Sequence, residues 1–178
     1  MNKRARQYVG LLSAVIAYYF IHEGAHLLYA VARGCFQQIN LMGLGMQIDV
    51  YSEKMTPTEL GVFCLVGSVA TLAVAYLLIS LIGKIKKLSS KVLKACAYYI
   101  TIAMLLIDPL YLSLLCGFFG GGDMNGIQLL VPEVIARVLY GLILLVNAFV
   151  FVKIVLPKYK SAFAEETTQC KNEKQTDR

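Results

Sequence analysis

The sequence predicts an all-α integral membrane protein with about four transmembrane helices and a short β-hairpin after the first of them. Of its 178 residues, 58% are hydrophobic and 16% are charged, whereas a soluble domain averages roughly 45–50% apolar and about 25% charged residues. Four stretches reach the roughly 20 apolar residues that a helix needs to cross the hydrocarbon core. Between the first two stretches, polar and apolar residues alternate around two glycines, a pattern typical of a hairpin.

We expect one integral membrane core over residues 1–163, followed by a polar and disordered tail over 164–178. The predicted spans within this core cover residues 8–32, 59–83, 92–118 and 132–156. The first span follows basic residues, as a signal peptide does, but it exceeds the roughly 7–15 apolar residues of a signal peptide. We therefore interpret it as a permanent transmembrane helix. The remaining residues are too few for an additional regulatory domain.

Two local features predict departures from regular helices. Asp108 and Pro109 lie inside the third span, and because proline lacks an N–H and clashes with the preceding turn, we expect a bend or break there. Residues 117–128 read GFFGGGDMNGIQ. Their glycines permit unusual backbone dihedrals and close approach to other segments, which predicts a re-entrant or broken segment before the last span.

The predicted hairpin covers residues 36–51, FQQINLMGLGMQIDVY. Unpaired strand edges are very costly in hydrocarbon, so we expect the hairpin to pack on protein or to lie at the membrane interface. It could simply fill space beside the helices, or it could offer a strand edge to an extended peptide. The sequence leaves both roles open.

Basic residues are unevenly distributed along the chain. They gather at the N-terminus, in the loop over 84–94 and in the C-terminal tail, whereas 34–58 contains only Lys54 and 117–131 contains none. The positive-inside rule therefore predicts cytoplasmic termini in a multi-pass protein of the cell membrane. The net charge of +6 thus reflects membrane topology, and we expect no nucleic-acid partner.

The most informative motif is HEGAH at 22–26, inside the first span. It places His22 and His26 one turn apart on one helical face, close enough to share a metal ion, with Glu23 beside them as a candidate general base for metal-bound water. Ionisable groups inside a membrane helix are costly and usually mark a functional site. The alternative is a pair of interior histidines that hydrogen-bond neighbouring helices.

The rest of a metal site must come from outside this motif. The chain has only two histidines, which excludes both a three-histidine site and a haem ligated on opposite faces by histidines one turn apart. A catalytic zinc usually has three protein ligands, so the third is expected to be a carboxylate. Asp123, in the glycine-rich segment, is the favoured candidate. Asp108 is the alternative ligand or a support for one, although it can also cap a helix end, and Glu133 fits a first-turn acid of the last span.

These motifs resemble the site-2 protease family of intramembrane zinc metalloproteases. HEGAH matches the family's HExxH motif in full. GSVAT at 67–71 is similar to a degenerate form of the family's Gly-Pro-Leu-Ala-Asn motif, with Thr71 in place of asparagine. GGGDMNG at 120–126 resembles its Asp-Gly motif, although two residues separate Asp123 from the following glycine. The resemblance covers the three spans of the catalytic core.

The resemblance implies one Zn²⁺ per chain, bound by His22, His26 and Asp123, with Glu23 as the catalytic base. It implies hydrolysis of peptide bonds in transmembrane or membrane-associated substrates, held as an added strand on the hairpin edge. The implied substrate contacts are Ser68, Thr71 and Asn125, although small residues at 67–71 can equally serve helix packing. Members of this family are usually drawn with the opposite membrane orientation to the one that the basic residues predict.

Two other function classes stay open at this point. One is a non-catalytic metal-binding membrane protein, either a pseudoprotease or a chaperone-like protein. The other is a metal or proton transporter, which would distribute ionisable groups along a path through several spans. The concentration of such groups on one helical turn favours the protease over the transporter.

Overall fold

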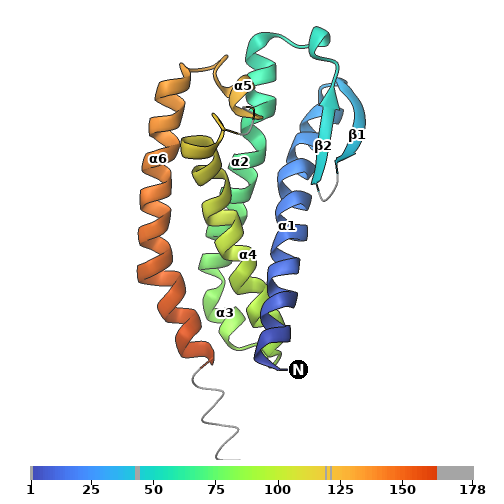
Figure 1. Ribbon diagram of the computed structural model, residues 1–178. Helices are drawn as coiled ribbons and strands as arrows, with labels where there is room; N and C mark the ends of the chain where they lie inside the picture. Colours follow the sequence, from blue (N-terminus) through green and yellow to red (C-terminus); the bar gives the residue numbers. More distant parts are fainter. Residues whose placement is uncertain (1, 43–44, 119, 121, 164–178) are drawn as a thin grey trace, which may run out of the picture.

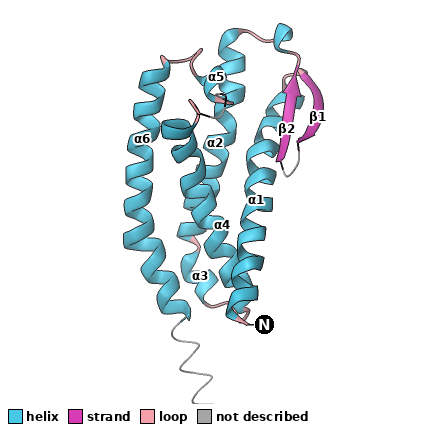
Figure 2. Cartoon of the chain, in the orientation of Figure 1, coloured by secondary structure: helices cyan, strands magenta, loops and turns pink. Residues whose placement is uncertain are grey.

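Four long helices stand side by side, with a hairpin beside the first of them (Figure 1). The computed structural model describes residues 2–42, 45–118, 120 and 122–163, so the predicted tail lies outside the described residues. All four helices are long and apolar enough to cross a membrane. They are α1 (Lys3–Ala32), α2 (Pro57–Ser80), α4 (Lys91–Leu110) with its π-helical continuation η2 (Tyr111–Leu115), and α6 (Glu133–Val150) with its π-helical continuation η3 (Phe151–Val155). The predicted mostly helical fold with a two-stranded hairpin is confirmed (Figure 2), and its four long helices fit the predicted transmembrane spans in length and composition.

A capping box marks where α2 begins. Two shorter helices, η1 (Ser52–Lys54) and α3 (Ile82–Lys86), flank α2 in the chain. At the start of α2, the backbone N–H of Glu59 donates to the Thr56 hydroxyl at 3.2 Å, and the Glu59 carboxylate accepts from the Thr56 N–H at 2.9 Å. This capping box satisfies two backbone donors that the helix cannot pair internally. The last spanning helix continues to Phe163, several residues beyond the predicted end at 156.

Of the bend or break predicted at Pro109, the break does not occur: the third span continues through the proline and changes to a π-helix at Tyr111. The proline removes the N–H that would bond the carbonyl of Leu105, one turn earlier. The side-chain amide of Asn147 in α6 donates to that carbonyl at 2.7 Å, and the Tyr76 hydroxyl of α2 donates to the Asn147 carbonyl oxygen at 2.7 Å. A neighbouring helix thus supplies the missing hydrogen bond, and the chain continues into η2.

The hairpin consists of the antiparallel strands β1 (Phe36–Met42) and β2 (Gly45–Val50). Ile39 lies opposite Ile48, and a bulge interrupts the register near the start of β1. β2 packs against α1, and only 4% of Ile48 is exposed. The hairpin therefore packs on protein, as the cost of unpaired strand edges in lipid requires.

The short helix α5 (Met124–Ile127) lies between the third and fourth spans and packs closely on α2. A Cβ atom on Gly126 would lie 2.3 Å from the Cys64 sulfur, and one on Gly61 would lie 2.5 Å from Cγ of Leu130. Only glycine fits at these contacts. They hold the segment that begins with Asp123 against the helix bundle.

We expect Gly126→Ala to destabilise the protein by roughly 1–3 kcal/mol, because the added methyl group overlaps the Cys64 side chain in a packed contact. The measurement is thermal unfolding of the detergent-purified protein. Gly83→Ala is the matched control, since no atom lies within 4 Å of a Cβ added there. Equal melting temperatures for the two variants would contradict this account of α5 packing.

Candidate metal centre

The two histidines of HEGAH face α2 from the C-terminal half of α1. Both are buried, with 8% of His22 and 3% of His26 exposed, and their Nε2 atoms lie 3.2 Å apart. Gly67 of α2 lies directly against the rings. A Cβ added there would come within 2.5 Å of His26 Nε2 and 2.8 Å of His22 Nε2. Both imidazoles therefore fit between α1 and α2 only because residue 67 is a glycine.

Asp123 brings a carboxylate to the same point from the segment before α5. Its Oδ2 lies 3.0 Å from His22 Nε2 and 3.5 Å from His26 Nε2. The structure thus brings together the three residues predicted as metal ligands, and their ligand atoms all lie within 4.8 Å of one another. Two imidazoles and a carboxylate form a donor set that could hold a metal ion.

Asp123 lies outside the spanning helices, and its ionisation follows from its neighbours. Burial alone would raise the pKa of this carboxyl group. The hydrogen bonds and positive charge of His22 and His26 outweigh burial and lower the pKa to about 2. The side chain is therefore a carboxylate at neutral pH, which is the form that binds cations.

The second ring nitrogen of each histidine also has an acceptor. His26 Nδ1 lies 2.8 Å from the carbonyl oxygen of Phe63 in α2, and His22 Nδ1 lies 3.3 Å from Oδ1 of Asp108 in α4. When a metal ion replaces the Nε2 proton, the nitrogen beside such an acceptor keeps its own proton, which leaves Nε2 as the lone-pair donor. Both imidazoles are thus oriented with their Nε2 atoms toward Asp123.

Asp108 supports His22 from behind and does not belong to the group of three ligand atoms. It is 1% exposed, and its carboxylate accepts hydrogen bonds from the hydroxyl groups of Tyr18 and Thr71. Carboxylates that hold a ligating histidine in this way fix its tautomer and ring orientation. Of the two roles that the sequence allows for Asp108, ligand or support, this geometry favours support.

The three residues implied as substrate contacts have different surroundings. Ser68 and Thr71 are fully buried; Ser68 shares a hydrogen bond of 2.6 Å with the Tyr140 hydroxyl, and neither residue lines the cavity beside the histidines. Asn125 does line that cavity, and it donates to the carbonyl of Gly120 at 3.3 Å. Among these three residues, Asn125 alone can reach a ligand in the cavity.

A cavity of about 1060 Å³ opens beside the three ligand atoms. Half-buried Glu23 lines it next to the histidines, and the strand β2 lines it with Gly45 through Ile48. The Glu23 carboxylate also interacts with the backbone of Ile48. The candidate general base, the ligand atoms and a strand edge therefore share one space that is large enough for several residues of a peptide.

Two supporting residues were not predicted from the sequence. Tyr18 lies one turn before His22 on the same face, and the two rings stack with centroids 5.4 Å apart. The four-residue spacing of Tyr18, His22 and His26 is a signal that could have identified this tyrosine. The carbonyl of Phe63 gives no such signal, because backbone acceptors do not depend on residue type.

No protein-family model matches the chain, and neither curated proteins nor solved structures give a match to it. The resemblance described from the sequence therefore stays a prediction. Function has to be argued from the geometry of the cluster and of the cavity beside it.

We expect Gly67→Ala to abolish metal binding, since its methyl group would overlap both imidazole rings. Bound metal per chain, measured by elemental mass spectrometry after purification, tests this. Gly24→Ala is the control on the histidine helix, because a Cβ there meets no atom within 4 Å. Retention of metal at the wild-type level in Gly67→Ala would show that the rings do not bind metal in this arrangement.

Asp123→Asn and Asp108→Asn are expected to differ in severity. Loss of a direct ligand in Asp123→Asn should remove stoichiometric metal, whereas Asp108→Asn removes a support and should weaken affinity roughly 10–100-fold. Competition with a chelator measures both affinities. A larger loss in Asp108→Asn than in Asp123→Asn would reverse the assignment of ligand and support.

Proposed function

We propose that the chain is an intramembrane zinc metalloprotease that hydrolyses peptide bonds of membrane-embedded or membrane-associated substrates. One observation carries this proposal: three metal-ligating atoms converge beside Glu23 in a cavity that has a β-strand as one wall. A structural metal site is closed on all sides, whereas a catalytic site keeps a position open to substrate and water. The cavity supports the second kind.

The spacing of the ligand atoms suits zinc. Four ligands placed tetrahedrally about 2.0–2.1 Å from a zinc ion lie about 3.3–3.4 Å from one another. The three distances among the ligand atoms of His22, His26 and Asp123 are 3.2, 3.0 and 3.5 Å. Three protein ligands of nitrogen and oxygen type also match the common composition of catalytic zinc sites.

Each residue of the centre has a defined task in this proposal. Zinc, when bound, lowers the pKa of water and polarises a carbonyl oxygen. Glu23 follows His22 directly and lines the cavity, where its carboxylate can accept a proton from the attacking water and return it to the leaving amine. Asp108 and the Phe63 carbonyl keep the Nδ1 atoms protonated, so that both Nε2 atoms stay available as ligands.

Strand β2 supports a peptide as the substrate class. A helical substrate must be extended before its peptide bond can be attacked, and pairing with a strand edge is a general way to hold an extended peptide. The described sheet has two strands, so β1 pairs with only one edge of β2. Residues 45–48 of β2 line the cavity. An added strand there would lie beside Glu23.

The predicted membrane orientation determines where water enters. With both termini in the cytoplasm, as the basic residues indicate, the centre lies nearer the opposite end of the bundle, where α5 and the hairpin are located (Figure 1). The proposal therefore includes entry of water and substrate from the non-cytoplasmic side.

We expect Glu23→Gln to reduce peptide cleavage by roughly 10²–10⁴-fold, the usual contribution of a general base, while metal content stays at the wild-type level. Cleavage is followed by mass spectrometry of membrane peptides incubated with the purified protein in proteoliposomes. Glu53→Gln, at an exposed position in η1, makes the same chemical change away from the cavity and should be fully active.

Unchanged cleavage by Glu23→Gln would refute the assigned mechanism. If wild type and Glu23→Gln both bind metal and neither cleaves any peptide, the chain is instead a non-catalytic metal-binding membrane protein.

A further inference from the structure

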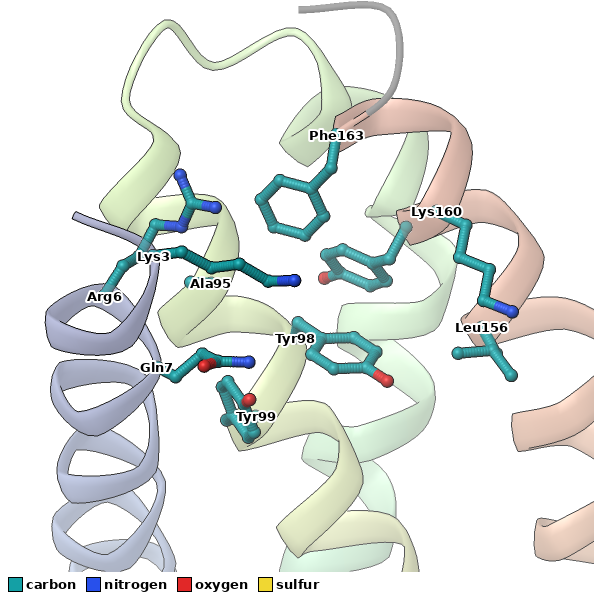
Figure 3. Close-up of a pocket in the computed structure, with 10 residues that line it drawn as sticks. Lys3, Arg6, Gln7, Ala95, Tyr98, Tyr99, Leu156, Lys160 and Phe163 are labelled. Carbon is teal, nitrogen blue, oxygen red and sulfur yellow. The ribbon is translucent and has the colours of Figure 1, made fainter. Parts of the chain in front are cut away.

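A second pocket lies at the end of the bundle opposite the metal centre. It has a volume of about 280 Å³ and lies between the first turns of α1, the first turns of α4 and the final turns of the last helix (Figure 3). Its apolar walls include Tyr98, Leu156 and Phe163. Because the pocket lies where three candidate spanning helices begin or end, it would be level with the head groups of a surrounding bilayer.

Within the part of the chain that the structure describes, the charged residues of this pocket are all cationic. Lys3 and Arg6 line it from one side and Lys160 from the other, and none of its described lining residues is acidic (Figure 3). The Arg6 guanidinium lies 5.3 Å from the centre of the Phe163 ring. This contact orients a planar donor group beside the pocket, and guanidinium groups bind phosphate oxygens well.

Two helix N-termini add positive potential at the same end. α1 and α4 both begin here, and neither has an acidic residue in its first turn. By contrast, α2 and α6 begin at the other end of the bundle, and their first turns contain Glu59 and Glu133. The dipoles of α1 and α4 are therefore not compensated by acids in their first turns, which favours an anion beside them.

A buried hydroxyl group provides independent evidence for a ligand. Tyr159 lines the pocket and is 1% exposed, and among the described residues its hydroxyl has no hydrogen-bond partner of ordinary geometry. The Thr101 hydroxyl, which donates to the Ala97 carbonyl at 2.7 Å, is the polar group beside it, but the two hydroxyls do not meet in hydrogen-bond geometry. An unsatisfied buried hydroxyl is costly, and an acceptor oxygen bound in the pocket would remove that cost.

We propose that this pocket binds the head group of an anionic phospholipid. The phosphate would lie among Lys3, Arg6 and Lys160, and a phosphate or head-group oxygen would accept the proton of Tyr159. The aromatic and aliphatic walls suit the glycerol and the first acyl carbons. Basic pockets between transmembrane helices at this depth suit anionic head groups. This inference does not depend on the proposed proteolytic activity.

The test is a titration of the detergent-purified full chain with phosphatidylglycerol and with phosphatidylcholine of the same acyl chains, followed by native mass spectrometry. Phosphatidylglycerol is expected to bind preferentially. The triple variant Lys3→Gln, Arg6→Gln and Lys160→Gln should bind it roughly 100-fold more weakly, from the usual contribution of each basic residue near an anionic surface. The triple variant Lys84→Gln, Lys87→Gln and Lys158→Gln removes the same charge outside the pocket and should lose only a small part of the affinity.

Tyr159→Phe tests the same site without a change of charge. It keeps the ring that packs with Ile82, Ile85 and Val155, so folding should be preserved, and it should weaken phosphatidylglycerol binding about fivefold. If the triple variant in the pocket does not fold, the Tyr159→Phe variant still tests the proposal.

Three results would overturn the proposal. They are equal binding of the two lipids by wild type, an equal loss of affinity in the two triple variants, and full binding by Tyr159→Phe. Displacement of the lipid by inorganic phosphate alone at matched concentration would instead identify a site for soluble phosphate.

Discussion

Two histidines buried in a spanning helix require a partner for every ring nitrogen, and the arrangement of the bundle meets this requirement. Each partner comes from a different part of the chain: the Phe63 carbonyl from α2, Asp108 from α4 and Asp123 from the segment before α5. An unpaired polar group in hydrocarbon costs several kcal/mol, so the helices cannot rotate or slide independently without exposing one of these groups. Gly67 makes the arrangement sterically feasible, since any side chain there would occupy the space of the rings.

The same principle accounts for the behaviour of Pro109. A proline within a transmembrane helix leaves one carbonyl without its donor, and in this chain Asn147 of the neighbouring helix provides the replacement. Tyr76 then satisfies the other end of the asparagine side chain. Side chains from two spanning helices, α2 and α6, are thus committed to a hydrogen-bonded chain that ends on the backbone of a third, α4, where water would serve in a soluble protein.

The sequence predicts the four spans and the hairpin well, because hydropathy over about 20 residues and alternation over a strand are local properties. It also predicts the pair His22 and His26, since their spacing alone places them on one face. The favoured third ligand, Asp123, could be named because few carboxylates lie near the apolar spans. The supporting contacts are different in kind. They depend on the rotation of each helix about its own axis. This rotation decides whether Thr71 faces a substrate or Asp108, and whether the Asn147 amide reaches the Leu105 carbonyl. Single-sequence hydropathy does not determine that rotation, because these helices are apolar on most faces.

The position of Asp123 has a consequence for folding. His22 and Asp123 are 101 residues apart in the chain, and the ligand from Asp123 is the one that does not belong to α1. A bound metal ion would therefore act as a cross-link that closes a loop containing the hairpin, α2 and α4. The entropy lost on closing a loop grows with its length, so a link of this span restricts the unfolded chain more than a short one would. If the proposed metal ion binds, its occupancy and the assembly of the helices would be linked: chelation would loosen the attachment of α5, and release of α5 would weaken metal binding.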